Sequence, residues 1–221
     1  MTATSPRRRR LAPLLIAVPL LTGCASTFLG SNVPSPESYR LGAVPSEPQA
    51  GAGPGALALA LTVARPRAST AIDTDRIAVL PAPSRFDYYS GVRWAEAAPQ
   101  MVQQNLVAAL QSSSRFAGVF AAPARVPAEL LLDVELRHFE AVAASEGAAP
   151  AAYVQLQASL VDSRRATRVT SFVSEARVPA SENQRSAIVA AFEEASARVV
   201  ADVVTRVSAA AATIEPAPGA R

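Results

Sequence analysis

Few residues in this 221-residue chain could do chemistry. His138 is its only histidine, so a nucleophilic triad or a histidine-based metal site would rest on this one side chain. It follows alternating apolar residues near a predicted strand end, and we assign it a structural or surface role. Asp73 and Asp75 lack a second acidic cluster, and we interpret them as a solvated turn. We therefore expect no catalytic residue, no metal site, no cofactor and no enzyme.

The single cysteine, Cys24, is predicted to be a site of modification. It follows Leu21-Thr22-Gly23, and upstream lie a basic run, 7–10, and an apolar run, 11–21. As a helix this apolar stretch would be about 20 Å long at ~1.5 Å per residue, too short for a ~30 Å hydrocarbon core. The pattern resembles a bacterial lipoprotein signal, cut between Gly23 and Cys24, with acyl chains such as palmitate added at Cys24. An ordinary cleaved signal with an incidental cysteine is the alternative.

Removal of the predicted signal peptide, residues 1–23, changes the charge of the chain. The whole chain has 21 basic and 18 acidic residues, and the signal holds four of the basic residues and no acid. The mature chain thus keeps 17 basic against 18 acidic residues, which gives no general basic affinity for nucleic acid. The roughly 198 remaining residues suffice for one domain with a core.

Periodicity predicts several strands and two amphipathic helices, the first of which should lie with one face on a sheet. Alternating apolar residues indicate strands, and apolar residues three or four positions apart indicate helices. The predicted strands are 38–41, 57–64, 76–80, 119–120, 130–139, 153–162 and 169–178, and the predicted helices are 95–112 and 182–207. The strands 153–162 and 169–178 are expected to form a hairpin.

Several boundaries are also predicted. Pro81 and Pro83 should stop the strand that begins at Arg76, and Ser181 should cap the second helix. We interpret residues 24–37 as a flexible tether, 38–207 as the folded domain and 208–221 as a disordered tail.

Four aromatic residues, Phe86, Tyr88, Tyr89 and Trp94, gather before the first predicted helix. Packing in the core or at a hinge is the commoner role of such a group. The alternative is an exposed surface that contacts lipid or a protein partner, with Tyr88 and Trp94 as the candidate contact residues.

The order and spacing of several short motifs resemble the ABC-type transport auxiliary lipoprotein family. These motifs are Ser38–Leu41, Arg76-Ile77, Arg93–Glu96 at the start of a helix, Ser114–Phe116, His138-Phe139, Phe172–Pro179 and the alanine-rich last helix. The resemblance covers roughly residues 38–207.

The resemblance implies a non-catalytic lipoprotein that accompanies MCE-type (mammalian cell entry) systems, which move phospholipids or sterol-like lipids across Gram-negative envelopes. It implies an α/β (α+β) domain with two amphipathic helices packed on a mixed or antiparallel sheet, which is compatible with the order of the predicted elements. It also implies an MCE-domain protein as partner, a separate ABC transporter as energy source and a ring-like homo-oligomer. Ala25, which follows Cys24, is not the aspartate of a retention signal, and this favours a lipid anchor at the periplasmic face of the outer membrane. The alternatives are a stand-alone chaperone of lipopolysaccharide or an outer-membrane protein and, third, an envelope hydrolase.

Overall fold

A computed structural model describes residues 2, 35–42, 56–82, 85–145 and 147–214. The predicted signal, Cys24, most of the predicted tether and residues 215–221 lie outside this part of the chain. Contacts divide the chain into two units, Met1–Pro34 and Ser35–Arg221. The fold below is that of the second unit, which contains the whole described hydrophobic core, from Leu41 to Ala211.

The longest strands form an antiparallel half of one nine-stranded sheet. β7 (Leu130–Val142) pairs with β8 (Ala151–Asp162), and β8 pairs with β9 (Thr167–Pro179). β8 and β9 are joined by a short turn, which confirms the predicted hairpin.

Shorter strands follow one another along the other edge of β7. β2 (Leu57–Val63), β3 (Arg67–Ala68) and β4 (Arg76–Ala82) each run parallel to it. β6 (Phe116–Ala121) extends the sheet beyond β2, at the end where β7 begins.

The opposite end of the sheet is extended by β5 (Arg85–Trp94), antiparallel to β4, and by β1 (Glu37–Tyr39), parallel to β5. The mixed sheet with two helices confirms the predicted fold class.

The strand β4 does not stop before Pro81 as predicted, but continues to Ala82. The register between β4 and β5 shifts there, and an irregular pairing tolerates a residue without an N–H.

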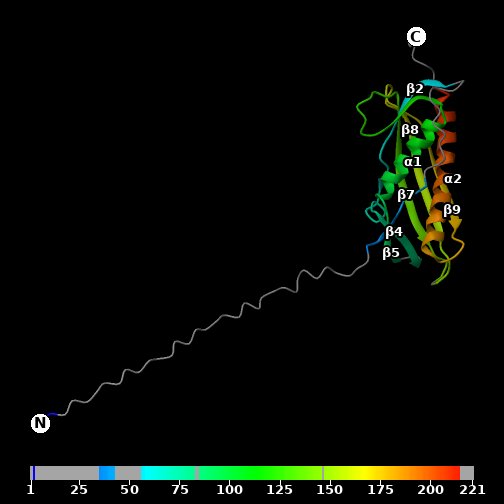
Figure 1. The fold of residues 1–221 in the computed structure, drawn as a ribbon. Helices are drawn as coiled ribbons and strands as arrows, with labels where there is room; N and C mark the ends of the chain where they lie inside the picture. Colours follow the sequence, from blue (N-terminus) through cyan, green and yellow to red (C-terminus); the bar gives the residue numbers. More distant parts are fainter. Residues whose placement is uncertain (1, 3–34, 43–55, 83–84, 146, 215–221) are drawn as a thin grey trace. The chain divides into compact units, whose positions relative to one another are not determined.

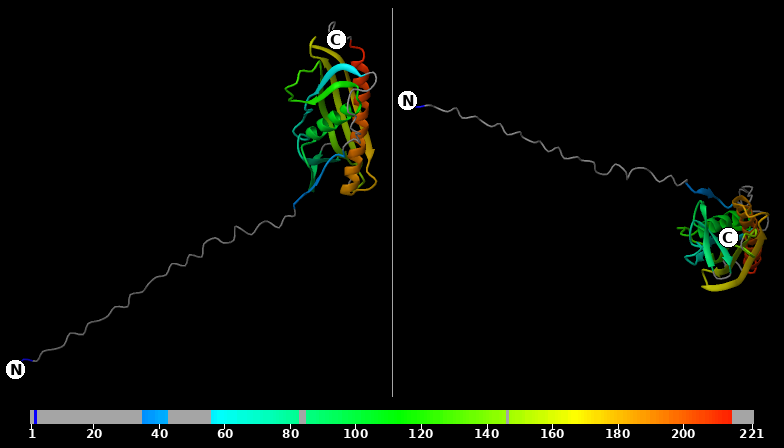
Figure 2. Two further views of the ribbon diagram at one scale, coloured as in Figure 1. Left: turned by 45° about the horizontal axis from the view of Figure 1, so that its top comes forward. Right: turned by 90° about the horizontal axis from the view of Figure 1, so that it is seen from below.

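Both helices pack on the same side of the sheet (Figure 1, Figure 2). α1 (Ala98–Ser112) lies near β2 and β6, and α2 (Arg185–Ala211) lies over β8 and β9. Pro99 occupies the first turn of α1, as predicted, where no N–H is needed. No described helix is long and apolar enough to cross a membrane.

The boundaries of α2 differ from the prediction. Gln184 is its N-cap, without a side-chain cap, so the prediction that Ser181 caps the helix is wrong. The helix also continues past Val207, because Val207 and Ala211 extend its buried stripe.

A β-bulge decides which residues of β7 face the helices. Leu132, Val134 and Leu136 are buried at alternate positions, and strict alternation would next bury His138. The register between β7 and β8 instead shifts between Leu136 and His138, so that Phe139 enters the core. His138 is thereby turned to the face that carries no helix.

Candidate functional site

Trp94 is part of the hydrophobic core. Its side chain is 1% exposed, with ring centroids 5.6 Å from Phe139 and 5.3 Å from Phe192 of α2. The hypothesis that Trp94 contacts a partner or lipid is therefore wrong, because its position at the end of β5 turns the indole beneath α2.

Tyr88 lies closer to the surface and stays a predicted contact residue. Its hydroxyl donates a hydrogen bond to the carbonyl of Ala71 at 3.0 Å, and the Arg76 guanidinium lies 3.6 Å from the ring centroid. Phe86 meets the ring edge-on at 5.5 Å and is 40% exposed, so it is the member of the group that a partner can reach most easily.

His138 belongs to a paired network on the face without helices. Its Nδ1 lies 2.6 Å from Oε1 of Glu140, whose other oxygen accepts the Phe139 N–H at 2.6 Å. The imidazole also stacks on Tyr153 at 4.4 Å. These contacts with a carboxylate and an aromatic ring give the imidazole a structural role.

The network continues from Tyr153 to β9. Its hydroxyl donates to Glu175 at 3.0 Å, and the Arg177 guanidinium lies 3.9 Å from its ring centroid. Burial is the main cause that raises the pKa of Tyr153. Hydrogen bonds from Gln155 and then Tyr153 lower the pKa of Glu175, which is therefore a carboxylate at neutral pH.

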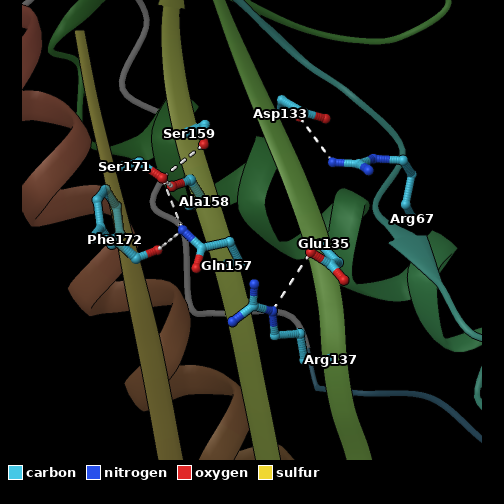
Figure 3. Close-up of polar contacts among 9 residues, drawn as sticks. All are labelled: Arg67, Asp133, Glu135, Arg137, Gln157, Ala158, Ser159, Ser171 and Phe172. Atoms are coloured by element: carbon cyan, nitrogen blue, oxygen red, sulfur yellow. Dashed lines mark hydrogen bonds and ion pairs between the residues drawn. The ribbon is translucent and has the colours of Figure 1, made fainter. Parts of the chain in front are cut away.

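The same face of β7, β8 and β9 continues as a polar surface that neither helix covers; we call it the open face (Figure 3). Its polar contacts are Arg67–Asp133 at 3.1 Å, Gln157–Ser171 at 2.8 Å and Ser159–Ser171 at 2.9 Å between strands, and Arg137–Glu135 at 3.5 Å along β7. It offers hydroxyl, amide and charged groups to a partner, as the polar part of a protein interface does.

A groove of about 570 Å³ lies between residues 40–42 and α1. Its apolar wall includes Leu41, Met101 and Ala108. Asn105 also lines it and is 8% exposed, and its side-chain amide makes no hydrogen bond to any described residue. The groove was not predicted from the sequence. Asn105, a polar residue three positions after Val102 on the apolar stripe of the predicted helix, was a signal that could have indicated it.

The acidic pair interpreted as a solvated turn lies at the surface. Asp73 pairs with Arg65 at 2.6 Å, and Asp75 lies 3.7 Å from Arg93. Within the described part of the chain, no three His, Cys, Asp or Glu side chains come together to hold a metal ion.

Comparison with known proteins gives one family and two informative structures. The family model described as "ABC-type transport auxiliary lipoprotein component" matches residues 39–204. The crystal structure of protein XCC0632 from Xanthomonas campestris is 28% identical, with a TM-score of 0.66 over 75% of this chain and 93% of that one. No curated protein has a matching sequence.

A second crystal structure, of an uncharacterized protein, has a TM-score of 0.61 over 78% of this chain and 99% of that one. At 12% identity this likeness shows the fold alone. The family match covers most of the chain and nearly all strands and helices of the second unit. The chain therefore belongs to the ABC-type transport auxiliary lipoprotein component family.

Proposed function

We propose that this protein is a lipid-anchored, non-catalytic docking component of an MCE-type system that transports phospholipids or sterol-like lipids. The observation that carries the proposal is the family match over residues 39–204, since an auxiliary component works beside a transporter. The contacts on the open face support it, because they pair acids with arginines and hydroxyls with amides instead of aligning a nucleophile with a base.

Attachment to the membrane is the second part of the proposal. Each buried methylene contributes about 0.8 kcal/mol, so one acyl chain holds a protein marginally, whereas two or three chains at Cys24 would hold it firmly. The dozen tether residues before β1 reach at most about 40 Å at ~3.3 Å each. The folded domain would therefore stay beside the periplasmic face of the outer membrane.

Docking is the third part. The open face offers hydroxyl, amide and charged groups, and the groove next to α1 offers the Asn105 side-chain amide, which has no partner among the described residues, beside an apolar wall. A transient partner uses such mixtures of polar and apolar contacts. An MCE-domain protein is the proposed partner, and oligomerisation of the protein itself would multiply the contacts.

The variant Cys24→Ala tests the anchor. We expect a folded protein that is lost from the membrane fraction and no longer supports lipid transport in cells. Ser31→Ala, a change within the predicted tether that spares the cysteine, is the matched control and should behave like the wild type. Normal transport by membrane-detached Cys24→Ala would contradict the proposal.

Pull-down of the lipidated protein tests the partner. Recovery of an MCE-domain protein in stoichiometric amounts from solubilised membranes is the expected result. Recovery of an outer-membrane protein or lipopolysaccharide in its place would favour the stand-alone chaperone.

A further inference from the structure

Five arginines lie at the end of the sheet where β7 begins. They are Arg115 before β6, Arg125 before β7, and Arg164, Arg165 and Arg168 in the β8–β9 hairpin, and we call them the basic tip. A backbone hydrogen bond of 2.8 Å from the Ser163 N–H to the Glu129 carbonyl joins the hairpin to the loop before β7, and one of 2.8 Å from the Leu57 N–H to the Arg115 carbonyl joins the start of β2 to the start of β6. Figure 1 shows β2 and the loop before β7 at this end.

The acidic side chains of the two loops at the tip are already engaged. Asp162 is 2% exposed and accepts the backbone N–H groups of Arg164 and Arg165 at 2.9 and 3.1 Å, and the Arg165 guanidinium at 2.9 Å. Glu129 accepts the Ala60 N–H at 2.7 Å.

The other arginines of the tip keep their charge uncompensated. Arg115, Arg125 and Arg168 have no ion-pair partner among the described residues, and Arg125 and Arg168 are exposed. The tip is therefore a cationic surface on a mature chain of nearly zero predicted net charge.

The hairpin holds its part of the tip in one shape. The buried Asp162 carboxylate closes the turn through two backbone N–H groups, and Ala166 adopts a left-handed φ of 51°. Val126, beside Arg125, is 48% exposed and adds an apolar contact. A surface already fixed in shape loses less conformational entropy when it binds.

The occupant must be anionic, and the fold favours a protein over a bilayer. The chain enters the sheet at β1, which pairs with Val92–Trp94 of β5. Trp94 packs on Phe139, and Phe139 lies nine residues along β7 from Leu130, the first residue of that strand, at the tip. The tip thus lies at the other end of the sheet from β1, where the chain enters the folded domain. A single exposed valine is also little apolar surface for insertion into a membrane.

From these observations we infer that the basic tip docks against a carboxylate-rich surface of a protein partner. The planar guanidinium of arginine binds carboxylates through two parallel hydrogen bonds, and arginine is enriched in protein interfaces. The inference deepens the proposed docking function, because it assigns one surface of the domain and one partner chemistry to it.

A charge-reversal experiment tests the inference. The double variant Arg125→Glu/Arg168→Glu changes two exposed arginines that have no ion-pair partner among the described residues, and it leaves the Asp162 turn intact. The matched control Arg85→Glu/Arg198→Glu makes the same change in net charge at two exposed arginines outside the tip, the groove and the open face. Both are made in the mature chain with Cys24→Ser, so that no acyl chain contributes to binding, and thermal melts confirm that both fold.

The probes are a Glu- and Asp-rich peptide, its Gln/Asn counterpart, and vesicles of phosphatidylglycerol and phosphatidylcholine. Binding to the acidic peptide should weaken about tenfold or more in the tip variant, change less than about twofold in the control, and fall with added salt. Equal loss in both variants, or binding to the phosphatidylglycerol vesicles but not to the peptide, would overturn the inference. If the tip variant is unstable, Arg125→Gln/Arg168→Gln replaces it, with a smaller loss in the same direction expected.

The lipidated protein then separates the inference from the proposed function. If the wild type captures an MCE-domain protein and the tip variant captures it equally well, the inference fails and the proposed function stands. If the wild type captures none while binding to the acidic peptide still depends on the tip, the proposed partner is wrong and the inference stands.

Discussion

Alternate residues of the strands β7, β8 and β9 form the two faces of this half of the sheet, and the two faces differ in burial and polarity. Leu136 and Leu156 pair across the covered face at 1% exposure and lie under the helices. Glu135 and Gln157, their sequence neighbours, pair across the open face among polar groups (Figure 3). An antiparallel sheet accommodates both environments because successive side chains point to opposite sides.

The difference separates what stabilises the fold from what is available to a partner. Complete burial of a leucine side chain contributes about 1.5–3 kcal/mol, whereas an exposed ion pair contributes about 0–1 kcal/mol. The Arg67–Asp133 pair, with side chains 69% and 40% exposed, is of the second kind. The exposed ion pairs of the open face thus contribute little to folding.

The largest effect should come from the covered face. Phe192→Ala removes a fully buried ring that packs at 5.0 Å on Phe139 and at 5.3 Å on Trp94. We expect the free energy of unfolding to fall by about 3–5 kcal/mol, measured by urea denaturation followed through Trp94 fluorescence. Arg198→Ala, on the exposed side of α2, should cost about 0.5 kcal/mol or less. A loss below about 1 kcal/mol for Phe192→Ala would show that burial on the covered face is not what stabilises the fold.

An intermediate effect is expected where a buried charge stabilises a turn. Burial alone would raise the pKa of Asp162, but hydrogen bonds from Arg165 and Arg164 lower it below the ordinary value of 3.8. The carboxylate therefore adds stability above about pH 4, and this contribution is lost as the pH falls through the lower, folded-state pKa.

Asp162→Asn should accordingly destabilise the domain by about 1–3 kcal/mol at pH 7, because the variant loses the ion pair with Arg165. The difference from the wild type should shrink below about pH 4, as melting temperatures recorded from pH 7 to pH 2.5 would show. A difference that stays constant over that range would mean that the charge of Asp162 is not what stabilises the turn.

The sequence predicts the covered face better than the open one. Alternation in 130–139 and 153–162 locates β7 and β8, because each apolar residue there has one firmly buried side. The four-residue periodicity around Phe192 locates α2 for the same reason. β5 was not predicted, since Phe86, Tyr88 and Tyr89 stand among Asp, Ser and Gly without a clean alternation.

Three features that the sequence does not predict, the bulge, the groove and the basic tip, depend on contacts between residues far apart in the chain. The bulge beside Arg137 reverses the side to which His138 points, and it shows only in the pairing with β8. The groove needs residues 40–42 beside α1, and the basic tip needs Arg115, Arg125 and Arg168 from three separate segments. None of these follows from a local period, and the prediction that Trp94 is a contact residue failed because its burial depends on α2.

The smallest effect should come from the open face. Gln157 donates hydrogen bonds to the Ser171 hydroxyl at 2.8 Å and to the Phe172 carbonyl at 3.1 Å, on a surface that solvent reaches. Because water can replace both bonds, Gln157→Ala should change the free energy of unfolding by less than about 0.5 kcal/mol. The adjacent Leu156→Ala is the matched control on the other face and should cost about 2–5 kcal/mol. If Gln157→Ala destabilised the domain as much as Leu156→Ala, the open face would belong to the folding core; if stability were unchanged but capture of the partner fell, that face would be a surface for binding.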